Sequence, residues 1–104
     1  ISIAGVHAHE FTFYGFLPHK KGRQTLLKEI AENERTSIFY ESPHRILKVL
    51  EALRESAPEK QITICRELTK MHETVSKGTA TELLLHYEAN PSTVRGEFVV
   101  IVSG

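Results

Sequence analysis

Strand-like and helix-like segments alternate along most of this chain, and their order constrains the fold more than any single motif. Short apolar or aromatic runs predict strands at residues 11–17, 36–40, 61–65 and 98–102, and a further short strand is predicted at residues 74–77. The run at residues 98–102 is continuously apolar, which is typical of a central strand covered on both faces. Because strands that alternate with helices form layered sheets, we predict an α/β fold with a mixed sheet of about five strands and three helices.

Three amphipathic segments between these strands predict the helices. The first presents an apolar face of Leu26, Leu27, Ile30 and Ala31. The second is predicted over residues 44–56, with Ser42 as its N-cap and Pro43 at its first position, because a serine hydroxyl can accept from the free N–H groups of a first turn. The third is predicted to begin at a capping box formed by Thr79 and Glu82 and to end before an Asn-Pro pair.

Composition limits what the chain can bind. Its 104 residues suffice for one small domain with a formal net charge of zero, so nucleic-acid binding requires charges segregated on one surface. A single cysteine, Cys65, cannot form an intrachain disulfide and favours a reducing, cytoplasmic compartment. No apolar run is long enough to cross a membrane, so no membrane partner is predicted. Residues 1–10 are interpreted as a connector from an upstream segment, and their two histidines lack further ligands at metal spacing, so no metal site is predicted.

Basic residues gather where the first two helices are predicted to begin. Acidic residues belong at the positive N-terminal end of a helix, yet Lys20, Arg23 and Arg45 occupy these starts. Helices that follow strands of one direction begin at the same sheet edge, and Arg66 and Lys70 come after a third strand. We therefore predict a basic rim that faces an anion, with phosphate of RNA or of a nucleotide-like ligand as the natural candidate. The alternative is an edge that is merely solvated by charged side chains.

The strand-to-helix turn over residues 40–45 carries the densest chemistry. It combines a phenol, a carboxylate, a hydroxyl, an imidazole and a guanidinium. Loops at the carboxyl ends of strands are where α/β sheets bind ligands. The turn is therefore a candidate binding site, and the alternative is a capped junction with solvated charges.

Four motifs occur in a characteristic order, namely GFLPHK (residues 15–20), FYESPHR (39–45), RELTKMHE (66–73) and RGE (95–97). Together they resemble the C-terminal half of bacterial small-subunit ribosomal RNA methyltransferases of the tetrapyrrole methylase-like family. The resemblance implies that residues 11–104 form the second of two α/β domains, with S-adenosylmethionine in the cleft between them. It also implies methylation of the ribose 2′-hydroxyl of a cytidine in small-subunit ribosomal RNA by a homodimer. Because the N-terminal half is missing, this chain alone is expected to be inactive.

The resemblance assigns candidate site residues by position. Contacts to the methyl donor are expected from Tyr40, Glu41, Arg66, Glu67, Gly96 and Glu97. Contacts to RNA phosphate are expected from Lys20, Arg23, Arg45 and Lys70. A group that assists the hydroxyl remains unassigned, with Glu41, Glu67, His72 and Glu73 as candidates.

Two other functions are compatible with the sequence. The chain could be a non-catalytic module for RNA binding or dimerisation, since a half-molecule exposes sheet edges. It could also be half of a porphyrin-type methylase, which the basic rim and the four motifs disfavour.

Overall fold

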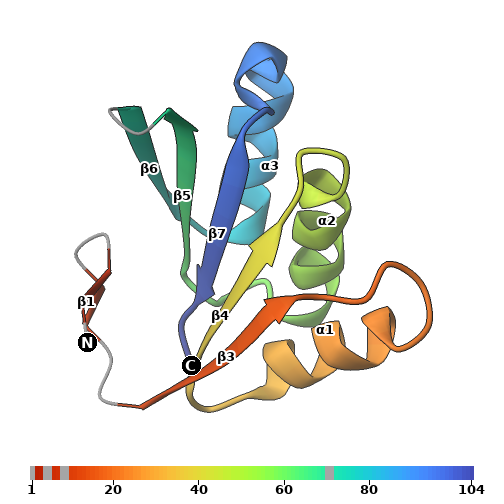
Figure 1. Cartoon of the computed structure of the whole chain (residues 1–104). Helices are drawn as coiled ribbons and strands as arrows, with labels where there is room; N and C mark the ends of the chain where they lie inside the picture. Colours follow the sequence, from red (N-terminus) through yellow and green to blue (C-terminus); the bar gives the residue numbers. More distant parts are fainter. Residues whose placement is uncertain (1, 4–5, 8–9, 70–71) are drawn as a thin grey trace.

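The computed structural model describes residues 2–3, 6–7, 10–69 and 72–104, with side chains described over residues 10–66 and 74–104. A five-stranded sheet has the order β3-β4-β7-β5-β6 and is covered by three helices on one face (Figure 1). The strands are β3 (Phe11–Phe16), β4 (Thr36–Glu41), β5 (Ile62–Thr69), β6 (His72–Gly78) and β7 (Glu97–Val102). The helices are α1 (Arg23–Glu32), α2 (Ile46–Ser56) and α3 (Ala80–Ala89), followed by a short 3-10 turn, Pro91–Thr93. The predicted mixed α/β sheet is confirmed.

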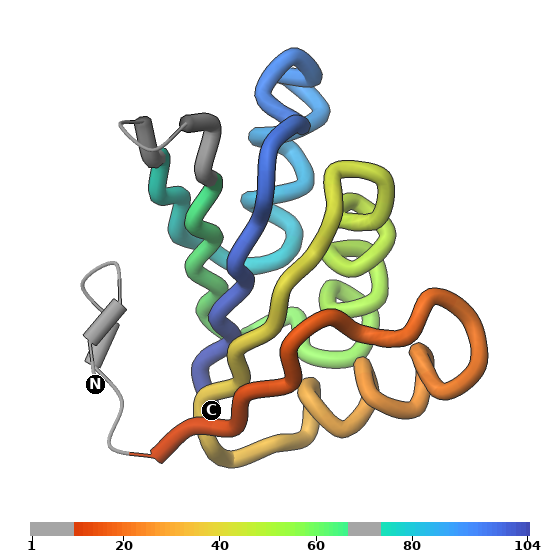
Figure 2. The backbone as a smooth tube through the Cα atoms, viewed as in Figure 1, coloured from red at the N-terminus to blue at the C-terminus, as the bar shows by residue number. Residues whose placement is uncertain are grey.

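The strand directions bring the ends of three strands to one edge. β3 is parallel to β4, whereas β7 is antiparallel to both β4 and β5. The strands β3, β4 and β5 therefore end, and β7 begins, at a single edge, which we call the carboxyl edge. Figure 2 shows the chain turning back there after β3 and after β4. Since α1 and α2 follow these two strands, both helices begin at this edge, as predicted from the sequence.

The core lies between the helices and the sheet. Its largest fully buried side chains include Phe39 and Phe98 from the strands, with Ile30, Leu50 and Leu84 from the three helices. On the opposite face, a smaller cluster consists of Ile38, Cys65 and Ile101, with Val99 partly buried beside it. No helix among the described residues covers this second face. We call it the open face.

The second helix begins later than predicted. Its first residue is Ile46, and Ser42 does not cap it. The Ser42 carbonyl accepts from the backbone N–H groups of Arg45 and Ile46, so residues 42–45 form a turn before the helix. The Ser42 hydroxyl instead accepts from the Arg45 guanidinium at 3.2 Å. The predicted N-cap was wrong because this turn puts Ser42 four positions before the first helical residue, where Arg45 takes the N-cap position.

β5 is longer than the predicted strand at residues 61–65. It continues to Thr69 because β7 pairs with it on one side and β6 on the other. The predicted strand at residues 74–77 is the second half of β6. Within the expected connector, β1 (Ser2–Ile3) and β2 (Val6–His7) pair as a separate antiparallel two-stranded sheet.

The predicted capping box of α3 is present. The Thr79 hydroxyl accepts from the Glu82 N–H at 3.4 Å, and the Glu82 carboxylate accepts from the Thr79 N–H at 2.9 Å. These bonds lower the pKa of the Glu82 carboxyl, so the stability that they contribute is present above its unfolded-state pKa and is lost as the pH falls through the lowered value.

Replacing Thr79 with alanine is expected to lower the free energy of unfolding by about 1 kcal/mol, since one amide at the helix start loses its acceptor. Urea unfolding measures this loss near neutral pH. Thr81→Ala is the matched control, because Thr81 is exposed within the first turn and makes no cap. Equal losses in the two variants would contradict a capping role.

Within the described ranges, no helix has both the length and the apolar character needed to span a membrane.

Candidate functional site

A cavity of about 540 Å³ opens at the carboxyl edge. Three segments form it, namely the end of β3, the end of β4 with its following turn, and the start of β7. Its lining residues are Phe16, Tyr40, Glu41, Ser42, Pro43, Gly96, Glu97, Phe98 and Val99. A concave site with apolar walls and a few polar groups is the usual form of a small-molecule site. We call it the edge cavity.

Aromatic rings form one wall of the edge cavity. The Tyr40 ring lies 5.2 Å from the Phe16 ring and 5.4 Å from the Phe13 ring, measured between centroids. Phe16 is 66% exposed and Tyr40 is 38% exposed. Two exposed rings at the mouth of a cavity provide flat apolar surface against which a heterocycle can stack.

The opposite wall depends on a glycine. Gly96 has φ of 87°, a left-handed conformation that residues with a Cβ rarely adopt. It directly precedes Glu97, the first residue of β7, and both line the edge cavity. The backbone can therefore approach a ligand closely at this point.

Glu41 lies at the base of the site and is already engaged. Its carboxylate is 4% exposed and forms an ion pair with Arg23, with 2.6 Å between Oε2 and Nη2. Its Oε1 accepts from the backbone N–H of Ser42 at 2.9 Å. The Arg23 guanidinium also donates to the Pro18 carbonyl at 3.2 Å. Because both of its oxygens have partners, Glu41 is better suited to holding the site together than to accepting a proton from a substrate.

Arg66 does not line the edge cavity. It is buried on the helix side of the sheet, where its Nε donates to the Thr74 hydroxyl at 3.2 Å. Its Nη1 has no hydrogen-bond partner in the part of the chain that the structure describes. Burial raises the pKa of the nearby Tyr87 phenol, an effect that Ser76 and the Arg66 charge partly offset. Arg66, predicted to contact the donor, is therefore not among the residues that line the cavity.

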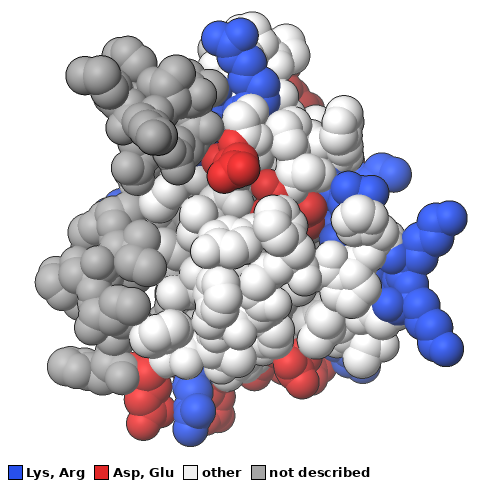
Figure 3. All heavy atoms as spheres, in the orientation of Figure 1, with Lys and Arg blue, Asp and Glu red and all other residues white. Residues whose placement is uncertain are grey.

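The predicted basic residues separate into different environments. Lys20 and its neighbour Lys21 are exposed on the β3–α1 loop, residues 17–22. Arg45 is half-buried beside Ser42, and Arg23 is buried against Glu41. Lys and Arg side chains project over the β3–α1 loop at the right of Figure 3, whereas the middle of the sheet face is mostly uncharged.

The structure does not describe the side chains of four predicted residues, namely Glu67, Lys70, His72 and Glu73. Lys70 lies outside the described residues. The backbone of Glu67 pairs with Glu97 and with Glu73, which places it at the carboxyl edge, and His72 begins β6. The described residues contain no group of three His, Cys, Asp or Glu side chains arranged to hold a metal ion.

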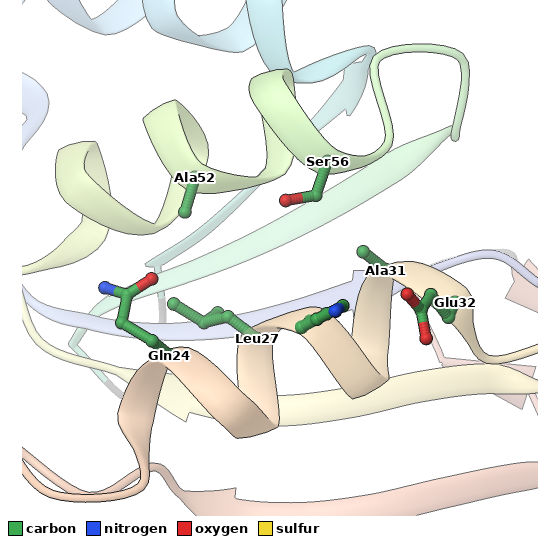
Figure 4. A pocket seen from close by; sticks show the side chains of 7 residues that line it. Gln24, Leu27, Ala31, Glu32, Ala52 and Ser56 are labelled. Carbon is green, nitrogen blue, oxygen red and sulfur yellow. The ribbon is translucent and has the colours of Figure 1, made fainter.

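The sequence did not single out Phe16, Phe98 or Val99 as cavity residues. Phe16 carried a usable signal, because it is an aromatic residue at the end of a strand within the GFLPHK motif. A second hollow, of about 410 Å³, lies between α1 and α2 and has no counterpart in the predicted site. Figure 4 shows Leu27 and Ala31 of α1 on the side toward Ala52 and Ser56 of α2.

Comparison with known proteins agrees with the fold. Residues 1–84 match the tetrapyrrole (corrin/porphyrin) methylases. The ribosomal RNA small subunit methyltransferase I of Erythrobacter litoralis is 41% identical over 103 residues, which cover 98% of this chain and 36% of the relative. Proteins of the same name from Haemophilus influenzae and Thermotoga maritima are 43% and 35% identical, over 97% and 100% of this chain and 36% and 46% of the relatives.

Two solved structures share the fold. The methyltransferase CobJ superposes with a TM-score of 0.62 at 24% identity, and the cobalt precorrin-4 methyltransferase CbiF with 0.64 at 13% identity. Each likeness covers 92% of this chain and 41% of the other chain. The chain belongs to the tetrapyrrole methylase family. Within that family, the curated relatives above bear the name of a ribosomal RNA methyltransferase, and this chain spans between about a third and a half of their length.

Proposed function

We propose that this chain is the C-terminal domain of an S-adenosylmethionine-dependent methyltransferase that acts on the 2′-hydroxyl of a cytidine in small-subunit ribosomal RNA. The names of the relatives support the class of substrate. The observation that carries the proposal is the juxtaposition of an aromatic-walled cavity and an exposed basic loop at one sheet edge. This arrangement suits a small heterocyclic ligand beside a phosphate backbone.

The residues of the edge cavity fit the adenosine end of the donor. Tyr40 and Phe16 offer ring surface for the adenine, while Gly96 permits close approach of the backbone and Glu97 begins the strand beside it. S-adenosylmethionine supplies a methyl group on a sulfonium. The cavity is open on one side and no residue here is assigned as a base, so in our proposal the isolated chain binds but does not catalyse. Arg66 and Glu67 would act from outside the cavity lining.

Lys20 and Arg45 are the proposed contacts to RNA phosphate, with Lys70 as a further candidate beyond the described residues. Lysine and arginine contacts to phosphate position a nucleic acid without reading its sequence. Arg23, which is buried and paired, serves this function indirectly. A ribosomal RNA substrate is consistent with a cytoplasmic location.

Replacing Lys20 with glutamine is expected to weaken RNA binding and to lower the slope of log affinity against log salt concentration by about 0.7, which corresponds to one lost phosphate contact on a single strand. Fluorescence anisotropy with a labelled single-stranded oligocytidylate measures this slope. Lys60→Gln is the control, because the Lys60 ammonium donates to the Asn33 carbonyl at the opposite end of the sheet. An unchanged slope in Lys20→Gln would count against Lys20 as a phosphate contact.

Donor binding is tested separately by calorimetric titration of the native chain with S-adenosylmethionine. Phe16→Ala should weaken the affinity for S-adenosylmethionine, whereas Lys20→Gln should leave that affinity unchanged. If neither S-adenosylmethionine nor RNA binds to the native chain, the proposed function of this domain in isolation is wrong.

One observation favours a second function, dimerisation. Among the side chains that the structure describes, five of the six exposed large apolar residues belong to strands of the sheet, and they are Phe11, Phe13, Phe16, Tyr40 and Val75. An exposed apolar patch of this kind often marks an interface. Sedimentation equilibrium of the native chain and of Phe13→Ser distinguishes a homodimer built on these exposed apolar residues from a monomer.

A further inference from the structure

The β3–α1 loop is fastened at several points along its short length. Leu17 is buried in the core at one end of the loop. At the other end, the Lys20 carbonyl accepts from the Arg23 N–H at 3.2 Å, and Gly22 turns the chain with φ of 86°. The exposed Lys20 and Lys21 side chains therefore stand on a segment whose backbone is held from within.

One arginine joins this loop to the turn that follows β4. Arg23 Nη1 donates to the Pro18 carbonyl, and Arg23 Nη2 donates to Glu41. Glu41 in turn accepts from the Ser42 N–H. A chain of three hydrogen bonds thus runs from the loop, through two side chains, to the turn beside the edge cavity.

The chemistry of this link requires a guanidinium. Arginine presents several N–H donors in a rigid planar fork, so one side chain can bind a carboxylate and a carbonyl at once. A lysine at this position keeps the charge but lacks the fork. A buried ion pair is in addition weak evidence for net stability, because two apolar residues of similar volume often stabilise a protein equally well. Net stability alone therefore does not explain the Arg23–Glu41 pair.

We propose that Arg23 and Glu41 are positioning residues that fix the β3–α1 loop against the β4–α2 turn, so that Lys20 and Lys21 meet RNA phosphate beside the edge cavity. This inference rests on the proposed function as far as RNA is concerned. The mechanical part, the fixing of the loop, stands on the contacts alone.

The experiment separates loop order from RNA binding. Two variants disrupt the link between Arg23 and Glu41, and we call them the clamp variants. They are Arg23→Lys, which keeps the charge, and Arg23→Met/Glu41→Leu, which replaces the buried pair with apolar side chains. Glu59→Gln is the control, since Glu59 is exposed between α2 and β5, far along the chain from the loop. Circular dichroism and thermal unfolding first establish the temperature at which each variant is fully folded. If the double variant does not fold, Arg23→Lys decides the question.

The first measurement is the NMR order parameter of the backbone amides of residues 19–22. In the native chain and in Glu59→Gln these amides should have order parameters of about 0.85. In the clamp variants the order parameters should fall below about 0.6. Unchanged order in the folded clamp variants would overturn the proposal.

The second measurement is the affinity for the labelled oligocytidylate, with and without Lys20→Gln. We expect Lys20→Gln to cost about threefold in affinity in the native background. In the clamp variants it should cost almost nothing, because a loosened loop no longer presents the lysine. A full Lys20 effect in a variant with a loosened loop would overturn the positioning role. Absence of RNA binding by the native chain would overturn the proposed function. The order parameters would still decide whether Arg23 and Glu41 hold the β3–α1 loop in place.

Discussion

Replacing Arg23 with methionine is expected to lower the free energy of unfolding by about 3–5 kcal/mol, because the Glu41 carboxylate would be left buried without its cation. Glu41 is 4% exposed, and its remaining partner, the Ser42 N–H, cannot compensate a charge. The loss is large for a domain of this size, in which the total stability is only about 5–15 kcal/mol. Urea unfolding followed by circular dichroism provides the measurement.

A second arginine offers a matched control. Arg35 forms an ion pair with Glu10 at 3.2 Å, but the two side chains are 60% and 71% exposed. Because exposed ion pairs contribute little, Arg35→Met should change the free energy of unfolding by less than about 1 kcal/mol. If both variants lose the same small amount, burial does not give the Arg23–Glu41 pair the weight that we assign to it.

Replacing Phe98 with alanine is expected to cost about 3–5 kcal/mol of stability, since the change removes a large buried ring and leaves a cavity. Phe98 is 1% exposed and lies in β7 between Glu41 of β4 and Arg66 of β5. Its ring also packs edge to face against Tyr87 of α3, with centroids 6.0 Å apart. The substitution therefore loosens the contact between the helix layer and the strand that borders the edge cavity.

Phe16→Ala is the control for this second prediction. Both phenylalanines line the edge cavity, but the Phe16 ring is 66% exposed, so its removal should change stability by less than about 0.5 kcal/mol. Denaturant unfolding of the two variants compares the effects directly. A loss in Phe16→Ala comparable to that in Phe98→Ala would mean that the exposed aromatic wall contributes to the fold and not mainly to ligand binding.

The sequence was sufficient to predict the layers of the fold because the signals for them are local. Apolar periodicity located the strands and helices, and the capping box of Thr79 and Glu82 placed the start of α3 correctly. The start of α2 was misplaced because Ser42 resembles an N-cap in sequence. In the structure its hydroxyl binds Arg45 instead.

Non-local features could not be read from the sequence. Arg23 and Glu41 are separated by 18 positions. They meet because α1 begins at the same edge of the sheet at which β4 ends. The orientation of Arg66 likewise depends on the register of β5 against β7, where Arg66 pairs with Phe98 and faces the helices. Charged residues inside β5 also concealed its length, because they interrupt the apolar pattern on which strand prediction relies.

The central position of β7 has a consequence for folding during synthesis. Residues 97–102 pair with β4 on one side and β5 on the other, although both partners are made earlier. Until the ribosome has released β7, β3–β4 and β5–β6 can form only as two separate half-sheets with unpaired inner edges. Their union requires contacts of long sequence separation, which slow folding and leave strand edges open to wrong partners. The five-stranded sheet can therefore close only after β7 has been made and has inserted between β4 and β5.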